Sequence, residues 1–458
     1  MAVSPPLRTP ASTQPKDTRL DRSHLWAALG STLVIGSFGV LAWQSHHHGV
    51  NLLGYGVAVT VAWAGFLLAW LTARHGASLR WFWILSIALA ARVSAGLSLP
   101  LLEDDPWRYL WDGYQTSVHG TPYGRAPAAS FADPSVPATL QRVLDRINHP
   151  DLPTVYGPTA QAAFWLSYLI APGQLWPWKA LLFLVDLLVG WALLRSRVRG
   201  ALVFWALCPL VLQSAFASAH VDGLAVGLTA GAFLAAAQGR AGTAAALLAA
   251  AVGARPIALL LAPWLLGRDR FAWGMLVAVG LLLHLPFLAF GGWGLSQEVR
   301  AALAGWEFNA SVFSLTAFAF GPAPARFLCV GLFLLGWGWY AARALRNAPT
   351  LPSPEWLIAI PGDRIYGLLW LLSPVVNPWY LLWIAPFVAV RPSVWGVTSL
   401  AAITLSYATG LRLDRPELGN FEHPVWLRPL EYGLIALAVG IDVGRHRRRS
   451  AAARTNRG

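Results

Sequence analysis

The sequence predicts an all-α protein, a polytopic bundle of about 12 to 14 helices that cross a membrane. Composition is the first observation behind this fold class. The chain has 458 residues, of which 56% are hydrophobic and only 12% are charged, whereas soluble domains carry about 25% charged residues. The 25 tryptophans are the second observation, because indole rings favour the membrane–water interface.

Apolar runs that are long enough to cross a bilayer recur along the chain. A transmembrane helix needs about 20 mainly apolar residues. Runs near this length occupy residues 25–43, 51–72, 81–100, 271–290 and 427–443. Two further runs, residues 158–172 and 179–194, follow each other where the alternation of sides allows one crossing. We therefore interpret residues 158–172 as partly interfacial.

Positive charges indicate which ends of the helices face the cytoplasm. Arginine and lysine cluster in short loops and at both chain ends, which is the positive-inside pattern of membrane proteins. This distribution disfavours nucleic-acid binding, despite the formal net charge of +13. We expect a disordered cytoplasmic tail at residues 1–24, a transmembrane domain at residues 25–443 and a basic cytoplasmic tail at residues 444–458.

The longest polar stretch between apolar runs, residues 101–157, is predicted to lie outside the cytoplasm. It holds seven of the 21 acidic residues, and a loop of this length is more typical of a functional segment than of a connector. The same alternation of sides places residues 217–222, 292–311 and 373–379 outside. It also places Arg255 toward the outer face, at a turn between two short apolar segments.

The external stretch is predicted to contain an amphipathic helix that begins at Asp105 and Pro106. Proline suits the first position of a helix, and aspartate suits the cap before it. Polar and aromatic residues then recur at a spacing that places them on one face, namely Asp105, Arg108, Tyr109 and Asp112. Another face carries Trp107, Leu110 and Trp111, which we expect to rest in the headgroup layer.

Two interpretations of these polar residues stay open. In the first, Asp105 only caps the helix and Asp112 only pairs with Arg108. In the second, Asp104 and Asp105 form a reactive pair. Adjacent carboxylates raise the pKa of one member, which suits a general base or a cation site.

Further motifs follow in order along the chain. They are Thr121–Tyr123, Ile147–Pro150, Thr154–Pro158, His220–Asp222, Gly253–Pro256, Phe308–Asn309 and Ser373–Tyr380. Together with residues 104–113, they resemble the polyprenol-phosphate-sugar-dependent glycosyltransferases of the GT-C fold. The nearest branch is the bacterial alpha-mannosyltransferase type, which includes glycosyltransferase family 87 and the mycobacterial mannan-elongating enzymes. Two positions depart from that pattern: Arg255 replaces a lysine, and Gly157 replaces the first of two prolines.

The resemblance implies an inverting glycosyltransferase of the inner membrane with an extracytoplasmic active site. It implies transfer of a hexose, most typically mannose, from a polyprenyl-phosphate-linked donor to a lipid-linked or cell-envelope glycan. Asp105 or Asp104 would be the base, and Arg255, helped by Arg108, would bind the donor phosphate. The expected substrate-binding residues are Asp112, Tyr156, His220, Asp222, Asn309, Asn377 and Tyr380.

No metal-ligating residue is predicted, although a divalent cation, Mg²⁺ or Mn²⁺, stays open at Asp104 and Asp105. The sequence contains no nucleotide phosphate loop, so a nucleotide-sugar donor is not expected. Plainer interpretations also stay open: His220 and Asp222 would cap a helix, and Arg255 would extend to the membrane interface.

Two other functions compete with transfer of a sugar. A transporter or flippase of lipid-linked saccharides would carry ionisable residues within its spans, whereas the acidic residues here cluster in the external loop. A non-catalytic membrane protein of envelope assembly would tolerate loss of those acidic residues.

Overall fold

The computed structural model of the chain is helical throughout the part that it describes, which confirms the predicted all-α class. The only extended pairing among the described residues is a bridge between Phe308 and Val375. The described residues are 22–47, 50–75, 80–288, 305–346 and 356–455. Most of the predicted tail at residues 1–24, and most of the predicted external segment 292–311, lie outside these ranges.

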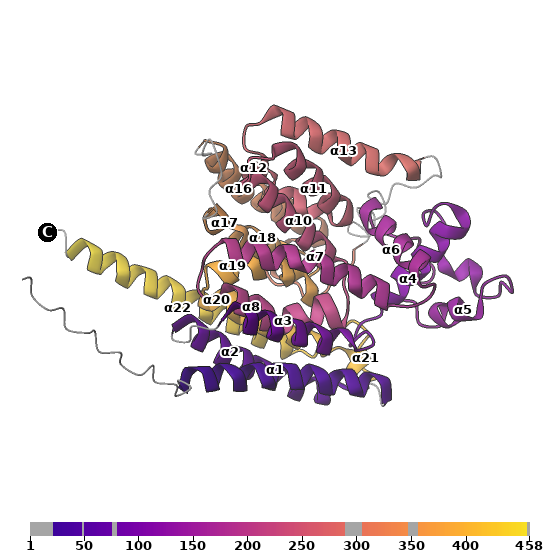
Figure 1. The fold of residues 1–458 in the computed structure, drawn as a ribbon, viewed down its shortest axis with the longest axis horizontal. Coiled ribbons are helices and arrows are strands. Elements are labelled where there is room, and N and C mark those ends of the chain that lie inside the picture. Colours follow the sequence, from indigo (N-terminus) through magenta and orange to yellow (C-terminus); the bar gives the residue numbers. More distant parts are fainter. Residues whose placement is uncertain (1–21, 48–49, 76–79, 289–304, 347–355, 456–458) are drawn as a thin grey trace, which may run out of the picture.

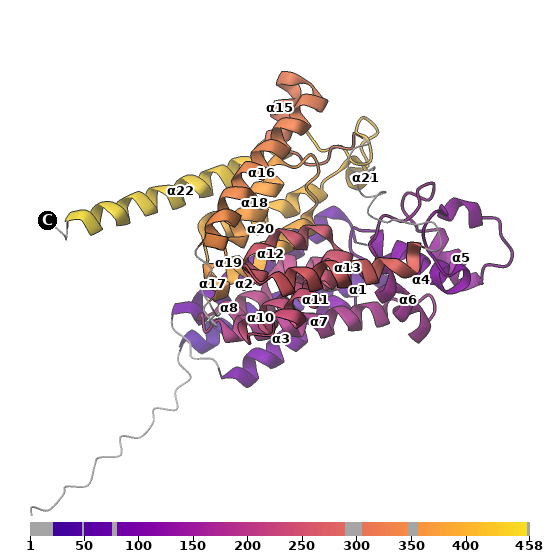
Figure 2. The same ribbon diagram turned by 90° about the horizontal axis from the view of Figure 1, so that it is seen from above.

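Three N-terminal helices match the first three apolar runs. They are α1 (Arg22–His47), α2 (Leu52–His75) and α3 (Trp81–Gly96). α1 and α2 lie side by side (Figures 1 and 2), and small residues allow this: a Cβ added to Gly30 would lie 2.4 Å from the backbone oxygen of Gly65. Small residues at such contacts let membrane helices approach closely.

The predicted external loop folds into a helical unit at one end of the molecule (Figure 1). Its elements are α4 (Asp105–His119), the 3₁₀ helix η1 (Pro127–Ser130) and α5 (Ala138–Leu144), and α6 (Pro158–Ile170), which follows the loop, packs with them. α4 packs on α6 at Gly113, where an added Cβ would lie 2.5 Å from the backbone oxygen of Phe164. Whether α6 is interfacial stays a prediction.

One prediction about this loop is wrong. Leu110 and Trp111 were expected in the headgroup layer, but they are 4% and 1% exposed and pack against α5 through Leu140 and Val143. The apolar face of α4 meets the apolar face of a second helix of the same loop, so it is buried by protein rather than by lipid.

The central part of the chain alternates long helices with short, broken ones. Its elements are α7 (Trp176–Arg195), α8 (Ala201–Leu207), α9 (Pro209–Val211), the π-helix η2 (Leu212–Ala217), α10 (Asp222–Ala237), α11 (Ala241–Ala254), the 3₁₀ helix η3 (Pro256–Leu261), α12 (Ala262–Leu266) and α13 (Arg270–Leu288). The predicted interruption at residues 253–256 is confirmed, since α11 ends at Ala254 and η3 begins at Pro256.

The C-terminal part completes the bundle. Its elements are α15 (Val312–Phe320), α16 (Pro322–Arg346), α17 (Trp356–Ala359), α18 (Gly362–Leu372), the 3₁₀ helix η4 (Pro378–Trp383), α19 (Ala385–Val390), α20 (Val394–Ala402), the 3₁₀ helix η5 (Ile403–Tyr407), α21 (Gly410–Leu413) and α22 (Leu427–Thr455). α22 continues as a helix through most of the predicted basic tail and projects from the bundle (Figures 1 and 2).

Five helices of the described ranges are long and apolar enough to cross a membrane, namely α1, α2, α7, α13 and α16. A sixth crossing results if the α9–η2 segment and α10, which are bent by 110°, count as one broken span. Other apolar helices, including α3, α11 and the segments 256–266 and 394–407, are shorter. The expected 12 to 14 crossings therefore stay a prediction, because short and broken helices cannot be counted by length.

Candidate active site

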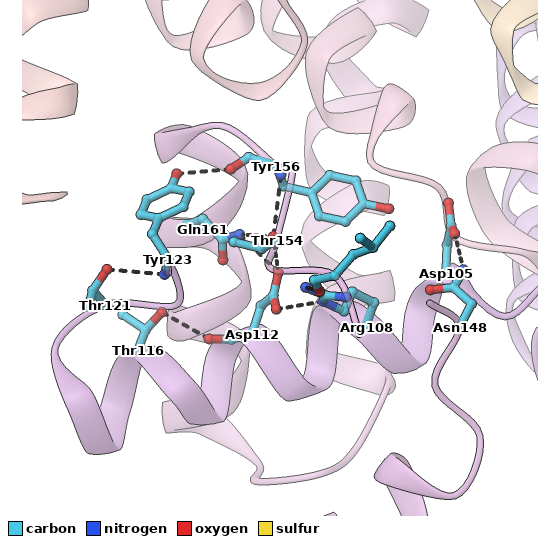
Figure 3. A network of polar contacts seen from close by, with 11 residues as sticks. Asp105, Arg108, Asp112, Thr116, Thr121, Tyr123, Asn148, Thr154, Tyr156 and Gln161 are labelled. Atoms are coloured by element: carbon cyan, nitrogen blue, oxygen red, sulfur yellow. Dashed lines mark hydrogen bonds and ion pairs between the residues drawn. The ribbon is translucent and has the colours of Figure 1, made fainter. Parts of the chain in front are cut away.

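The start of α4 presents two carboxylates to one amide. Asp104 occupies the cap position but makes no capping hydrogen bond, and Asp105 is the first helical residue. Asn148 instead donates from Nδ2 to Oδ1 of Asp104 at 2.9 Å and to Oδ1 of Asp105 at 2.7 Å; Figure 3 shows the pair of Asp105 and Asn148. The interpretation of Asp105 as a simple cap therefore does not hold.

His220 lies against these acidic residues. Its Nδ1 is 3.5 Å from Oδ2 of Asp105, and its Nε2 is 4.0 Å from Oε2 of Glu103. The ring is completely buried and stacks on Trp379, with ring centroids 3.9 Å apart and an interplanar angle of 14°. The His220 and Asn377–Tyr380 motifs thus meet at the start of α4.

The local fold explains how His220 reaches this position. The π-helix η2 ends with two hydrogen bonds of 2.8 Å, from the backbone nitrogen of Ser218 to the oxygen of Gln213 and from that of His220 to Ser214. Ala219 has a left-handed backbone with φ +54°, which strains a residue that has a Cβ. The chain then bends by 110° into α10. This break places His220 in the non-helical link between η2 and α10.

Asp222 and Arg255 form the second ion pair of the site. Nη2 and Nε of Arg255 lie 2.9 Å and 3.1 Å from Oδ2 of Asp222, while Trp383 donates from Nε1 to Oδ1 at 2.8 Å. Asp222 is completely buried and is the first residue of α10, where the helix dipole stabilises a negative charge. The ion pair therefore connects the helix break at Arg255, between α11 and η3, to the helix break before α10.

Two tyrosines cover the ion pair from the external loop. The guanidinium carbon of Arg255 lies 5.6 Å from the ring centroid of Tyr156, a cation–π distance. Tyr156 makes an edge contact with Tyr109 of α4, with centroids 5.1 Å apart. The Tyr109 hydroxyl accepts a 3.5 Å hydrogen bond from the backbone nitrogen of Val221, which lies between His220 and Asp222.

The acidic residues at the start of α4 differ in ionisation. Burial alone would raise the pKa of Asp105, but its close contact and electrostatic interaction with His220, helped by Asn148 and Arg255, lower that pKa to about 2. Burial and the charges of Asp105 and Asp104 raise the pKa of Glu103 well above its ordinary value. Burial and the charge of Asp105 also raise the pKa of Asp104. Asp105 is therefore the carboxylate that holds a negative charge most firmly.

Arg108 and Asp112 belong to a separate buried network (Figure 3). Nε of Arg108 donates to Oδ1 of Asp112 at 3.0 Å, and its Nη2 donates to the backbone oxygen of Leu152 at 2.8 Å. The other oxygen of Asp112 accepts from Thr154 at 2.5 Å and from Gln161 at 2.9 Å. The pairing of Asp112 with Arg108 is confirmed, and it fastens the segment before Tyr156 to α4.

The late motifs contact each other as well as the site. The backbone nitrogen of Val376 donates to the oxygen of Phe308 at 2.9 Å. The amide of Asn309 donates to Oε1 of Glu431 at 2.9 Å, so Asn309 faces α22. Tyr380 stacks on Trp370, with centroids 4.8 Å apart.

Several residues of the site carry no role in the sequence prediction. Asn148 belongs to the Ile147–Pro150 motif, and Trp379 belongs to the Ser373–Tyr380 motif, so the motifs themselves pointed to both. Arg412 of α21 donates from Nη2 to the backbone oxygen of Leu102. No sequence signal marks Arg412, because it meets the acidic segment only through the tertiary fold.

Metal binding has no prepared ligand cluster in the part of the chain that the structure describes. No group of three or more His, Cys, Asp or Glu residues there is arranged to hold a metal ion. A divalent cation at Asp104 and Asp105 stays a prediction.

Comparison with known proteins bears on the family. A family model described as "Alpha-(1->6)-mannopyranosyltransferase, N-terminal domain" matches residues 24–267, and this range contains Asp105, His220, Asp222 and Arg255. Searches of the curated proteins and of the solved structures find no match. The matched range is just over half of the chain and agrees with the mannosyltransferase branch expected from its motifs. This chain belongs to the alpha-(1->6)-mannopyranosyltransferase family and is a mannosyltransferase with helices apolar enough to cross a membrane.

Proposed function

We propose that this mannosyltransferase takes mannose from a polyprenyl-phosphate-linked donor and passes it, with inversion, to a lipid-linked or cell-envelope glycan. One observation carries the proposal. Asp105 contacts His220, and Asp222, two residues further along the same helix break, contacts Arg255. A carboxylate that accepts a proton and a guanidinium that binds phosphate therefore lie in one neighbourhood.

Asp105 is the proposed base. It takes the proton of the acceptor hydroxyl while the hydroxyl oxygen forms its bond to the anomeric carbon. A pKa of about 2 keeps Asp105 ionised at neutral pH and makes proton transfer late, after the attacking oxygen has become acidic. Asp104 is the weaker candidate, because its side chain is exposed, whereas Asp105 lies against the buried ring of His220.

Arg255 is the proposed phosphate ligand. As the bond between the anomeric carbon and the phosphate oxygen breaks, the electron pair stays on the leaving polyprenyl phosphate. A guanidinium neutralises that charge and offers several donors in one plane. Asp222 and the ring of Tyr156 hold Arg255 in place, and the start of α10 adds a favourable dipole. Arg108 then serves to anchor Asp112.

The remaining predicted residues are proposed to contact or position the sugars. Tyr380 and Asn377 are the candidates to line the acceptor side with His220, because Trp379, between them in the sequence, stacks on His220. Asn309 is proposed to position the Ser373–Tyr380 motif, which the adjoining Phe308 contacts at Val375.

The extracytoplasmic location of the site is part of the proposal. The unit of α4, α5 and α6 lies at one end of the bundle, and the basic C-terminal end of α22 lies at the other (Figures 1 and 2). With cations facing the cytoplasm, residues 101–157 would face outward, as expected for a multi-pass protein of the inner membrane.

The deciding experiment measures mannose transfer by the purified protein in lipid nanodiscs, from a synthetic polyprenyl-phosphate mannose to a synthetic mannolipid. We expect Asp105→Asn to slow transfer by about 10²–10⁴-fold and Arg255→Ala by about 10²–10³-fold. Asp133→Asn is the matched control, because Asp133 lies in the same loop and its carboxylate bonds only Ser135 among the described residues.

Each outcome of this assay has a defined meaning. Unchanged transfer by Asp105→Asn with loss in Asp104→Asn would move the base to Asp104, and unchanged transfer by both would remove the base assignment. No transfer by the wild type from any polyprenyl-phosphate sugar would refute the proposed donor. NMR of the product tests inversion, and addition of EDTA tests whether a divalent cation takes part.

A further inference from the structure

A large cavity lies along α22, apart from the candidate active site. Its volume is about 1370 Å³, and α2, α18 and α20 form the other walls. α22 lines it from Glu431 to Arg449, and the C-terminal end of this helix points away from the unit of α4, α5 and α6 (Figures 1 and 2). Neither the proposed base, Asp105, nor the proposed phosphate ligand, Arg255, lines this cavity.

Its lining is rich in positive charge. Six arginines line the cavity, together with three acidic residues that already have partners. Asp363 pairs with Arg391 at 2.5 Å, Glu431 accepts from Asn309 at 2.9 Å, and Asp442 accepts from the backbone nitrogen of Trp395 at 2.9 Å. The arginines are Arg74, Arg364, Arg391, Arg445, Arg447 and Arg449.

Most of this positive charge has no protein counter-ion. Within the described ranges, Arg364, Arg445, Arg447 and Arg449 have no ion-pair partner, and their side chains are exposed. Guanidinium groups bind phosphate oxygens with paired hydrogen bonds. The cavity therefore suits a ligand that carries phosphate.

The cavity is also apolar along part of its length, and this distinguishes a phospholipid from a soluble phosphate as its ligand. On α22, Ile435 and Val439 line it, followed by His446 and Arg449 at spacings that keep one face of the helix. Leu368 of α18 adds to the apolar part. A soluble phosphate would gain no binding energy from this apolar wall, whereas a phospholipid has both an anionic headgroup and apolar chains.

We propose that this cavity binds an anionic phospholipid of the surrounding bilayer. Arg364, Arg445 and Arg449 hold the phosphate, and the acyl chains lie along Ile435 and Val439. Basic pockets between transmembrane helices on the cytoplasmic side are a recognised way to bind anionic headgroups. This site does not depend on the identity of the sugar donor or on the base.

The test uses the full chain in phosphatidylcholine nanodiscs, with native mass spectrometry to titrate added phosphatidylglycerol. The triple variant R364Q/R445Q/R449Q removes the proposed phosphate ligands. We expect it to bind phosphatidylglycerol roughly a hundredfold more weakly, since each arginine near an anionic lipid contributes about fivefold. The matched control R343Q/R346Q/R448Q removes three cations that do not line the cavity, and we expect wild-type binding.

Two further arms use the wild type alone, so they do not depend on how the variants fold. Phosphatidylglycerol should bind, while inorganic phosphate and glycerol phosphate should fail to displace it. Displacement by either soluble phosphate would overturn the lipid proposal in favour of a soluble anion site. Equal weakening in the triple variant and its control would also overturn it, because the attraction would then belong to the whole basic surface.

Discussion

Glu103 and Asp105 are only two residues apart, yet His220 and the surrounding protein push their pKa values in opposite directions. Asp105 has the shorter contact to the imidazole, 3.5 Å against 4.0 Å, and also accepts from Asn148. Glu103 is largely buried, with a side chain that is 11% exposed, and lies near two other acidic residues, Asp104 and Asp105. Asp105 therefore keeps its negative charge down to a lower pH than Glu103 does.

This difference predicts a pH-dependent stability that Glu103 controls. Its folded-state pKa lies above the ordinary value of 4.5, so its contribution to stability is complete below pH 4.5. That contribution falls by up to about 1.4 kcal/mol per pH unit until the folded-state pKa is passed. We expect Glu103→Gln to match the wild type below pH 4.5 and to become progressively more stable than it above that pH, as measured by thermal unfolding in nanodiscs.

Glu417→Gln is the control for this measurement. Glu417 is an exposed residue paired with Arg415, and its pKa is lowered by backbone and Arg415 hydrogen bonds. Since it is ionised in both states once the pH is more than about one unit above 4.5, its replacement should leave the difference from wild type independent of pH there. Parallel pH curves for Glu103→Gln and the wild type would contradict the assignment.

At the scale of elements, two helix interruptions and one close backbone contact assemble the site. A Cβ added to Gly157 would lie 2.3 Å from the backbone oxygen of Gly253, so only glycine allows the segment before α6 to lie against the end of α11. This contact brings Tyr156 beneath Arg255. Any residue with a Cβ at position 157, proline included, would collide with that oxygen.

We expect Gly157→Ala to destabilise the protein by about 1–3 kcal/mol, the usual effect of overpacking. It should also slow mannose transfer, because separation of the two segments moves Tyr156 away from Arg255. Thermal unfolding and the nanodisc assay measure the two effects. Gly56→Ala is the control, since an added Cβ there meets nothing within 4 Å; equal effects of the two substitutions would refute the close-contact explanation.

At the scale of the whole molecule, a buried ion pair connects three helices. Arg92 of α3 and Asp186 of α7 lie 2.8 Å apart with side chains 4% and 9% exposed. Arg92 also donates to the backbone oxygen of Ala206 at 2.7 Å, and Trp205 donates to Asp186 at 2.6 Å. A transporter would have ionisable residues within its spans, but these two are held by protein groups of α8, which indicates a structural role.

Replacement of one member of this ion pair should destabilise the protein more than replacement of both members. We expect Asp186→Leu and Arg92→Met each to destabilise the protein by about 3–5 kcal/mol, because each leaves a buried polar partner uncompensated. The double variant Arg92→Met with Asp186→Leu should lose less than either single one. Unfolding of all three variants in nanodiscs measures the coupling, and simple additivity would contradict the structural role.

Much of the fold was predictable because it depends on short stretches of sequence. Apolar length and charge placement predicted α1, α2, α3 and α13 close to their observed bounds. Proline and glycine signals predicted the start of α4 and the break before Pro256. The predicted location of Leu110 and Trp111 in the headgroup layer was wrong, because α5, the helix that covers them, is short and gives little periodic signal in the sequence.

The sequence by itself determined the membrane character, the helical class, the family motifs and the residue types of the site. Only the tertiary structure decided that Asp105 meets His220 across 115 positions of the chain, that Trp379 stacks on that ring, and that Arg255 pairs with Asp222. The physical reason is that helix formation depends on neighbours within a few turns, whereas burial, ion pairing and pKa depend on groups that arrive from distant segments.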